Sequence, residues 1–404
     1  MVEQNYTNPP AGGNIGTAVI KVVGVGGGGC NAVSRMYKDR IPEVEYLAIN
    51  TDQQALERVS VPVRIRVGDT TARGLGVGGD PSRGRACHEE SREQLRAALQ
   101  GADLVFVAAG MGGGTGTGGA PIVAEVAQEV GALVVGVVTK PFGFEGSQRM
   151  KKALAGVEAL RQKVDTLIVI PNDRLMSVSD ERLTLDSAFR MADNILRQGI
   201  QSITEMILVP GEINLDFADV RAIMENAGPA WMAIGHGKGE DRARQAAESA
   251  LNSPLLEVSI SGAKGVLLQI TGGSDLSLQE VHEAAQVVAG MVDPDANIIF
   301  GTTTDPKMEN EVKLTLIATG FPVVGEPAQD KSAGAREALT DEDLAAVPPF
   351  LRHNAAARKY VTQSNGNVAK PAANPAPVSP RPQTTPVFNA AAAYGTNGVK
   401  QPVR

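Results

Sequence analysis

Short apolar segments alternate with amphipathic stretches along the first half of the chain. The apolar segments are expected to be strands at Val19–Val25, Tyr46–Asn50, Val61–Val67, Leu104–Ala109, Leu133–Thr139 and Thr166–Ile170. Helical patterns lie between most of them, at Ser82–Leu99, Ala120–Val130 and Gln148–Lys163. Strands that alternate with helices form parallel sheets covered on both faces, so we predict an α/β fold. Ligands of such sheets bind at the carboxyl ends of the strands.

The second half begins with a long helical pattern from about Leu183 to Leu208, which the Pro210-Gly211 pair ends. A short helix is expected at Phe217–Asn226. Further strands are expected at Trp231–Ile234, Gly265–Thr271, Asn297–Thr303 and Lys313–Thr319, with helices at Asp241–Leu251 and Leu276–Met291. This second set predicts a smaller α/β domain.

The composition changes after Phe321, where 11 of the 24 prolines occur. Together with many Ala, Asn, Gln and Ser, they predict a disordered tail. Asp341–Arg352 interrupts it with acidic and then clustered apolar residues, and is either a segment that folds on a partner or an incidental apolar patch. The expected parts are a flexible segment 1–18, a ligand-binding domain 19–182, a central helix 183–209, a loop and helix 210–227, a second domain 228–321, a short linker 322–340, a partner-binding peptide 341–352 and a disordered tail 353–404.

The composition indicates which partners and which cellular compartment to expect. The chain has 404 residues and a net charge of -7, and no basic segment dominates, so nucleic acid is not an expected partner. The two cysteines, Cys30 and Cys87, indicate a reducing compartment rather than a disulfide framework. With no apolar signal core and no run long enough to span a bilayer, we expect a cytoplasmic protein without direct membrane insertion.

Two glycine loops carry the candidate chemistry. The first, Gly24-Val-Gly-Gly-Gly-Gly-Cys30-Asn31, fits the GxGxxG pattern of dinucleotide-binding proteins, and Asp52 lies at a suitable distance for a ribose contact. Read alone, this loop suggests a Rossmann-type NAD-dependent oxidoreductase, or merely a tight strand–helix turn.

The second loop, Gly110-Met-Gly-Gly-Gly-Thr-Gly-Thr-Gly-Gly119, changes that interpretation. Glycines let backbone N–H groups approach phosphate oxygens, and a helix amino end favours anions. Two such loops can hold a polyphosphate between them. Neither ends in the Gly-Lys-Ser/Thr of a P-loop, which disfavours the ordinary nucleotide triphosphatases.

The segment Gly112-Gly-Gly-Thr-Gly-Thr-Gly118 resembles the signature of the tubulin/FtsZ superfamily. Other segments resemble further parts of the family's sequence and occur in the same order along the chain: Ala48–Asp52, Gly74–Gly76, Thr139–Phe142 with Glu145-Gly146, Ile170–Asp173 and Asn214–Asp219. The resemblance covers essentially Val19 to Gly320. It implies a Rossmann-like, parallel-sheet GTPase domain, a long central helix and a second α/β domain, with GTP as substrate, GDP as product and Mg²⁺ on the phosphates.

The resemblance also assigns the nucleotide contacts. They are expected at Gly27, Gly28, Gly29, Cys30, Asn31, Gly113, Gly114, Thr115, Gly116, Thr117, Glu145, Arg149, Asn172, Phe189 and Asp193. Phe189 and Asp193 lie four residues apart and share a helix face, where a ring can stack on a purine and a carboxylate can accept from guanine. Their spacing alone favours a core Phe and an exposed Asp, and the resemblance reverses that preference. Mg²⁺ ligands are not assigned.

The resemblance implies that the catalytic residues are Asn214, Asp216 and Asp219, on a loop that enters the nucleotide pocket of the next subunit. Taken alone, the two acids could simply cap the following helix. The family's activity is head-to-tail filament formation for bacterial cell division at mid-cell, and the peptide 341–352 resembles its binding segment for membrane anchors and regulators. A non-hydrolysing tubulin-like scaffold and a plasmid-segregating relative are the alternatives within the family.

Overall fold

The computed structural model of the protein describes residues 18–41, 43–176, 184–209, 211–213, 215–253 and 260–321. The chain divides into two compact units, 1–325 and 326–404, and every described residue belongs to the first. Asn214, the peptide 341–352 and the expected disordered tail therefore lie outside the described residues.

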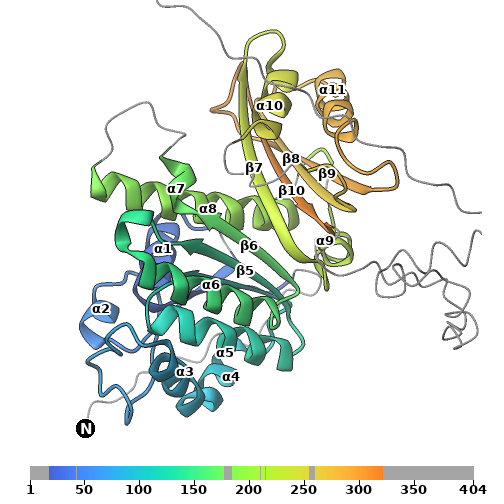
Figure 1. Ribbon diagram of the computed structural model, residues 1–404. Coiled ribbons are helices and arrows are strands. Elements are labelled where there is room, and N and C mark those ends of the chain that lie inside the picture. The colour runs from blue at the N-terminus through green and yellow to red at the C-terminus, as the bar shows by residue number, and fades with distance from the viewer. Residues whose placement is uncertain are drawn as a thin grey trace, which may run out of the picture. The chain divides into compact units, whose positions relative to one another are not determined.

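Ten strands of this first unit form one sheet in the order β3-β2-β1-β4-β5-β6-β7-β10-β8-β9. Figure 1 labels the strands of this sheet from β5 to β10. The ten strands are β1 Ile20–Val25, β2 Val44–Asn50, β3 Val63–Arg66, β4 Leu104–Gly110, β5 Leu133–Lys140, β6 Thr166–Pro171, β7 Gly228–Lys238, β8 Gly265–Gly272, β9 Asn297–Thr304 and β10 Glu311–Thr319. Neighbours from β3 to β7 are parallel, β10 is antiparallel to both of its neighbours, and β9 is parallel to β8. The predicted mostly parallel α/β fold is confirmed.

Strand β7 joins the two halves of the sheet. Its first residues pair with β6, beginning at Thr166 and Gly228, while the rest of the strand pairs with β10. The helices are α1 Gly26–Met36, α2 Gln53–Glu57, α3 Pro81–Glu90, α4 Arg92–Leu99, α5 Thr115–Glu129, α6 Ser147–Arg161, α7 Asn172–Leu175, α8 Leu185–Leu208, α9 Phe217–Met224, α10 Arg242–Leu251 and α11 Leu278–Ala289. Short 3-10 turns lie at Tyr37–Asp39 and Gly143–Glu145.

The central strands are apolar throughout because helices cover both faces of the sheet. Successive side chains of a strand point to opposite faces. Val22 accordingly belongs to the core shared with α1 and α8, whereas the next residue, Val23, belongs to the core shared with α3 to α6. A third core packs α10 and α11 onto β7, β8 and β10. The apolar residues that predicted the strands are thus the residues that the covering helices bury.

One predicted helix, Ser82–Leu99, is two helices in the structure. The chain leaves helical geometry at Ser91, where φ is -104° and ψ is 16°. The Ser91 hydroxyl accepts a hydrogen bond of 3.2 Å from the backbone N–H of Gly68. Serine competes with helical backbone in this way, and here it separates α3 from α4.

The glycine runs also differ from the prediction, because part of each is helical. Helix α1 begins at Gly26 and α5 begins at Thr115, five residues before the expected start at Ala120. These glycines allow backbones to touch: a Cβ on Gly118 would lie 2.0 Å from the carbonyl oxygen of Pro81. Close packing against α3 offsets the poor intrinsic helix propensity of glycine.

The strand order places the two glycine loops beside each other. β1 lies between β2 and β4, so the connections that leave its carboxyl end and that of β4 depart on opposite faces of the sheet. In open α/β sheets, ligands bind at such a switch point, in the crevice outside the carboxyl ends of the strands. The first glycine loop follows β1 and the second follows β4, so both border this crevice.

Candidate nucleotide site and catalytic loop

The two glycine loops meet through their backbones. Gly26 has a φ of +71°, and a Cβ there would lie 2.6 Å from the backbone nitrogen of Gly116. A Cβ on Gly29 would lie 2.2 Å from the carbonyl oxygen of Ala108. Side chains at these positions would push the loops apart. Gly26 and Gly29 therefore allow the close packing of the backbone around the site rather than a contact with a ligand.

Other glycines of the same loops face open space. A Cβ on Gly27 or on Gly113 would meet no atom of a non-neighbouring described residue within 4 Å. Gly28 is also exposed and lies against Gly110 of β4. The loops therefore present bare backbone at Gly27, Gly28 and Gly113, whereas three other predicted contacts are buried: Gly29, Gly114 and Gly116.

Helix α5 begins in this crevice with its first-turn N–H groups uncapped by a side chain. Its N-cap is Gly114, which makes no side-chain cap, and no acidic residue lies in the first turn. The amino end of a 15-residue helix carries unsatisfied donors and a positive dipole. This end is therefore suited to an anion such as a phosphate.

The two predicted threonines of the second loop have different surroundings. Thr115 is half-buried, and its hydroxyl lies 2.6 Å from that of Thr51. Thr117 is buried; its hydroxyl accepts a 2.8 Å hydrogen bond from the N–H of Gly112, and its methyl group packs where a Cβ on Gly156 would lie. Of the two hydroxyls, the structure favours Thr115 as a phosphate donor.

The first helix contains Cys30 and Asn31 in opposite situations. The Cys30 thiol is buried, faces the carbonyl oxygens of Gly24 and Ile49, and has its pKa raised by burial to about 12. Only the backbone of Cys30 is therefore available to a ligand. Asn31, by contrast, is exposed.

Glu145, Arg149 and Asn172 follow the carboxyl ends of β5 and β6. The Glu145 carboxylate accepts from the N–H of Phe142 at 2.8 Å and pairs with Arg149 at 3.2 Å. Arg149 also packs over the second loop, since a Cβ on Gly112 would lie 2.7 Å from its Cγ. Asn172 is 4% exposed, and its Oδ1 has no hydrogen-bond partner among the described residues. A buried acceptor without a partner suits a ligand donor.

The predicted base-contacting residues lie on α8. Phe189 is 42% exposed and packs edge-on against Phe142, with ring centroids 5.6 Å apart. Asp193 is half-buried and forms an ion pair with Arg35 of α1. Sequence reasoning missed Arg35, although it lies four residues after Asn31 and so shares a face of α1 with it.

Burial raises the pKa of Asp193 from 3.8 to about 6, and Arg35 opposes the shift. A protonated carboxyl cannot accept from both guanine donors. We therefore predict that GTP affinity falls below about pH 6, by roughly tenfold for each further pH unit. The measurement is the GTP affinity of the wild type and of Asp193→Asn between about pH 7 and about pH 5. The phosphates of GTP titrate identically with both proteins, so the ratio of the two affinities isolates the protonation of Asp193. A ratio that stays constant with pH would contradict the assignment.

The loop acids lie at the other end of the sheet. Asp216 is the N-cap of α9 and accepts a 2.8 Å hydrogen bond from the N–H of Asp219. Further along α9, Arg221 donates at 3.3 Å to the carbonyl oxygen of Gly131, which precedes the amino end of β5. A seven-residue strand such as β4 separates its two ends by about 20 Å. The acids and the glycine loops of one chain therefore cannot contact the same phosphate.

The stretch before the acids is fastened to the edge of the sheet. Ile213 donates to the Thr302 hydroxyl at 3.0 Å, and its carbonyl oxygen accepts from the Thr302 N–H at 3.1 Å. Asn214 is outside the described residues, so the structure brings together Asp216 and Asp219 of the three predicted catalytic residues.

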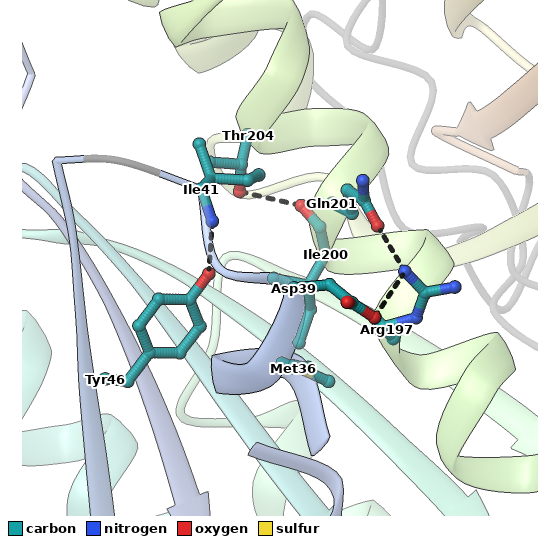
Figure 2. Close-up of a pocket in the computed structure, with 8 residues that line it drawn as sticks. All are labelled: Met36, Asp39, Ile41, Tyr46, Arg197, Ile200, Gln201 and Thr204. Carbon is teal, nitrogen blue, oxygen red and sulfur yellow. Dashed lines mark hydrogen bonds and ion pairs between the residues drawn. The ribbon is translucent and has the colours of Figure 1, made fainter. Parts of the chain in front are cut away.

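A small hollow of about 10 Å³ lies between α8 and the segment after α1, apart from the glycine loops (Figure 2). It is lined by Met36, Asp39, Ile41, Tyr46, Arg197, Ile200, Gln201 and Thr204. Arg197 reaches both Gln201 at 3.0 Å and Asp39 at 4.0 Å. The volume suits one water molecule, so the hollow serves the packing of α8 rather than a nucleotide.

The described residues also show whether a grouped metal site or a membrane-spanning helix is present. Among them, no three His, Cys, Asp or Glu side chains are grouped as metal ligands. In the same part of the chain, no helix is long and apolar enough to cross a bilayer.

Two family models match the sequence. The model of the Tubulin/FtsZ family GTPase domain matches residues 19–180, and that of the FtsZ family C-terminal domain matches 228–322. Among solved structures, an empty FtsZ dimer of M. jannaschii is 45% identical, with a TM-score of 0.73 over 76% of this chain and 89% of that chain.

Two structures from Haloferax volcanii share the fold at lower identity. The GDP-bound CetZ1 monomer is 20% identical, with a TM-score of 0.67 over 76% of this chain and 95% of that chain. The CetZ2 protofilament bound to GTPγS is 20% identical, with a TM-score of 0.63 over 74% of this chain and 92% of that chain.

Proposed function

The chain belongs to the Tubulin/FtsZ family, and from that premise we propose that it polymerises head-to-tail into filaments that form the cytokinetic ring of dividing bacteria. It is a GTPase that binds GTP and GDP, as its GTPase domain implies.

One observation carries the proposal: the loop acids and the glycine loops lie at opposite ends of the sheet. Asp216 and Asp219 begin α9 beside the amino end of β5, whereas the glycine loops follow the carboxyl ends of β1 and β4. If both act on one GTP, they must come from two copies of the chain. A contact between opposite ends does not close on itself, so it produces a filament.

The nucleotide end would work as follows. The bare backbones of Gly27, Gly28 and Gly113 and the amino end of α5 bind the phosphates, and Thr115 adds a hydroxyl donor. Glu145 and Arg149 lie toward the ribose, and Asn172 offers its amide oxygen, which has no hydrogen-bond partner in the part of the chain that the structure describes. Phe189 stacks on the base, while the Asp193 carboxylate accepts hydrogen bonds from guanine. Adenine has no matching donors for this carboxylate and is therefore disfavoured.

Hydrolysis would take place when the loop of the next subunit arrives. Asp216 and Asp219 then polarise the attacking water, and Asn214 helps to orient it, since phosphoryl transfer depends mainly on positioning and electrostatics. The substrate is GTP as its Mg²⁺ complex. Mg²⁺ at such a site would be held largely by the phosphates and by water.

Exposed apolar side chains at the nucleotide end support assembly. Leu75, Phe144 and Met176 are exposed and follow the carboxyl ends of β3, β5 and β6. Leu185 is also exposed and begins α8, four residues before Phe189. Exposed apolar side chains gathered in one region mark a contact surface. We propose that this rim receives the loop end of the next subunit.

Replacing Leu75, which is 79% exposed, with Asp should raise the concentration needed for assembly by at least about tenfold, because an unpaired charge would be buried in the contact. Sedimentation with GTP and Mg²⁺ measures the concentration at which the protein assembles. The GTP affinity of the variant should stay unchanged. The matched control is Leu154→Asp on α6, away from the rim, where the residue is 51% exposed. Equal effects of the two substitutions would remove Leu75 from the contact.

The cellular role rests on resemblance to the division protein of the family. We place the filament in the cytoplasm at mid-cell, tethered to membrane anchors and regulators through residues 341–352. Depletion of the protein should give cells that grow without dividing. Normal septation after depletion would refute the division role while leaving the GTPase intact.

A further inference from the structure

Thr51 is a buried hydroxyl beside the phosphate loops to which the proposed function gives no role. It follows β2 directly and is 0% exposed. Its Oγ1 lies 2.6 Å from Oγ1 of Thr115, the first residue of α5. The contact therefore links the end of one strand to the helix start that faces the crevice.

The direction of this hydrogen bond follows from the ligand. Phosphate oxygens are acceptors, so a bound phosphate requires Thr115 to donate its only hydroxyl proton. The Thr115 oxygen then accepts from Thr51. The result is a chain in which Thr51 donates to Thr115 and Thr115 donates to phosphate, and each hydrogen bond in such a chain strengthens the next.

The backbone of Thr51 is fixed on both sides. Its N–H donates to Oδ1 of Asn50 at 2.9 Å, and its carbonyl oxygen accepts from the N–H of Gly76 at 3.2 Å. Gly76 follows Leu75, whose backbone also bridges to Asp52. A hydroxyl held by a rigid backbone can orient its partner at little entropic cost.

We propose that Thr51 is a positioning residue: its hydroxyl orients Thr115 as a donor to a phosphate oxygen of the bound guanine nucleotide. This inference rests on the proposed function, because it requires a nucleotide phosphate beside Thr115. Thr51 itself does not touch the nucleotide, so its effect must pass through Thr115.

The test measures the affinity of the full-length protein for GTP, GDP and guanosine by competition with a fluorescent GTP analogue. Thr51→Val, which keeps the shape and removes the hydroxyl, should weaken GTP and GDP binding about tenfold and leave guanosine binding unchanged. Thr51→Ser, which retains the hydroxyl, should bind like the wild type. Adding Thr51→Val to Thr115→Ala should weaken GTP binding no further than Thr115→Ala alone.

Thr204→Val is the matched control, since Thr204 is equally buried and its hydroxyl donates to the Ile200 carbonyl of α8. It should leave all three affinities unchanged. Unaltered GTP binding in Thr51→Val, an equal loss for guanosine, or an additive effect with Thr115→Ala would each overturn the inference and leave the GTPase standing. A wild-type protein that does not bind GTP would overturn both.

Discussion

Replacing Asp216 and Asp219 together with Asn should lower GTP hydrolysis by assembled protein about 100-fold or more, with little change in GTP affinity. Both acids lie at the end of the sheet opposite the glycine loops, so a chain lacking them keeps its own nucleotide pocket. Asn caps a helix about as well as Asp, so α9 should remain folded. Phosphate release at high protein concentration and a separate GTP-binding titration measure the two effects.

The control is Asp241→Asn at the start of α10, where the Asp side chain is exposed and makes no cap hydrogen bond. It removes one exposed carboxylate at a helix start, as each substitution of the double variant does, and should leave hydrolysis unchanged. If the double variant hydrolyses GTP normally, the acids only cap α9, and the water must be oriented by other groups.

Replacing Gly119 with Ala should destabilise the protein by about 2–3 kcal/mol, although Ala is normally the better helix former by about 1 kcal/mol. The new Cβ would lie 2.1 Å from Cε1 and 2.3 Å from Nε2 of His88. The ring cannot withdraw, because it is fully buried and its Nδ1 lies 2.8 Å from the Gly84 carbonyl oxygen. Denaturant unfolding of the two proteins measures the loss.

The clash predicts a rescue. His88→Ala alone should also destabilise, because it leaves a cavity against α5. Combined with Gly119→Ala, the new methyl group should enter that space, and the double variant should be more stable than the sum of the single effects by about 2 kcal/mol. Strict additivity would show that His88 does not limit the size of residue 119.

The sequence predicted the parts of the site that depend on local pattern. Apolar strands followed by glycines located both loops. The helical pattern also placed Phe189 and Asp193 on one long helix, and both lie on α8 in the structure. The expectation that Asp216 could cap a helix is also confirmed by its hydrogen bond to Asp219. The catalytic role of these acids stays a prediction.

Contacts between distant segments had no signal in a single sequence. Nothing in the chain pairs His88 with Gly119, Thr51 with Thr115, or Arg35 with Asp193, because each pair comes from elements that meet only in the fold. Ser91 likewise broke a helix because Gly68 offered it an N–H across the structure. Tertiary partners, rather than local propensity, decided these positions.

The dinucleotide pattern of the first loop is explained by the same packing. Gly24, Gly26 and Gly29 satisfy it because each lies against backbone of the loop, of β4 or of α5, where a Cβ would lie 2.2 to 2.6 Å from another atom. Close strand–helix packing at a phosphate site imposes these glycines whatever nucleotide is bound. The second loop and its helix start are what distinguish this site from that of an oxidoreductase.

The central claim is that one subunit completes the site of the next, and phosphate release per subunit as a function of protein concentration tests it most directly. With GTP and Mg²⁺ in excess, we predict almost no activity per subunit below a threshold concentration and a steep rise above it. Activity per subunit that stays constant down to high dilution would mean that each chain carries a complete site, and would contradict the account.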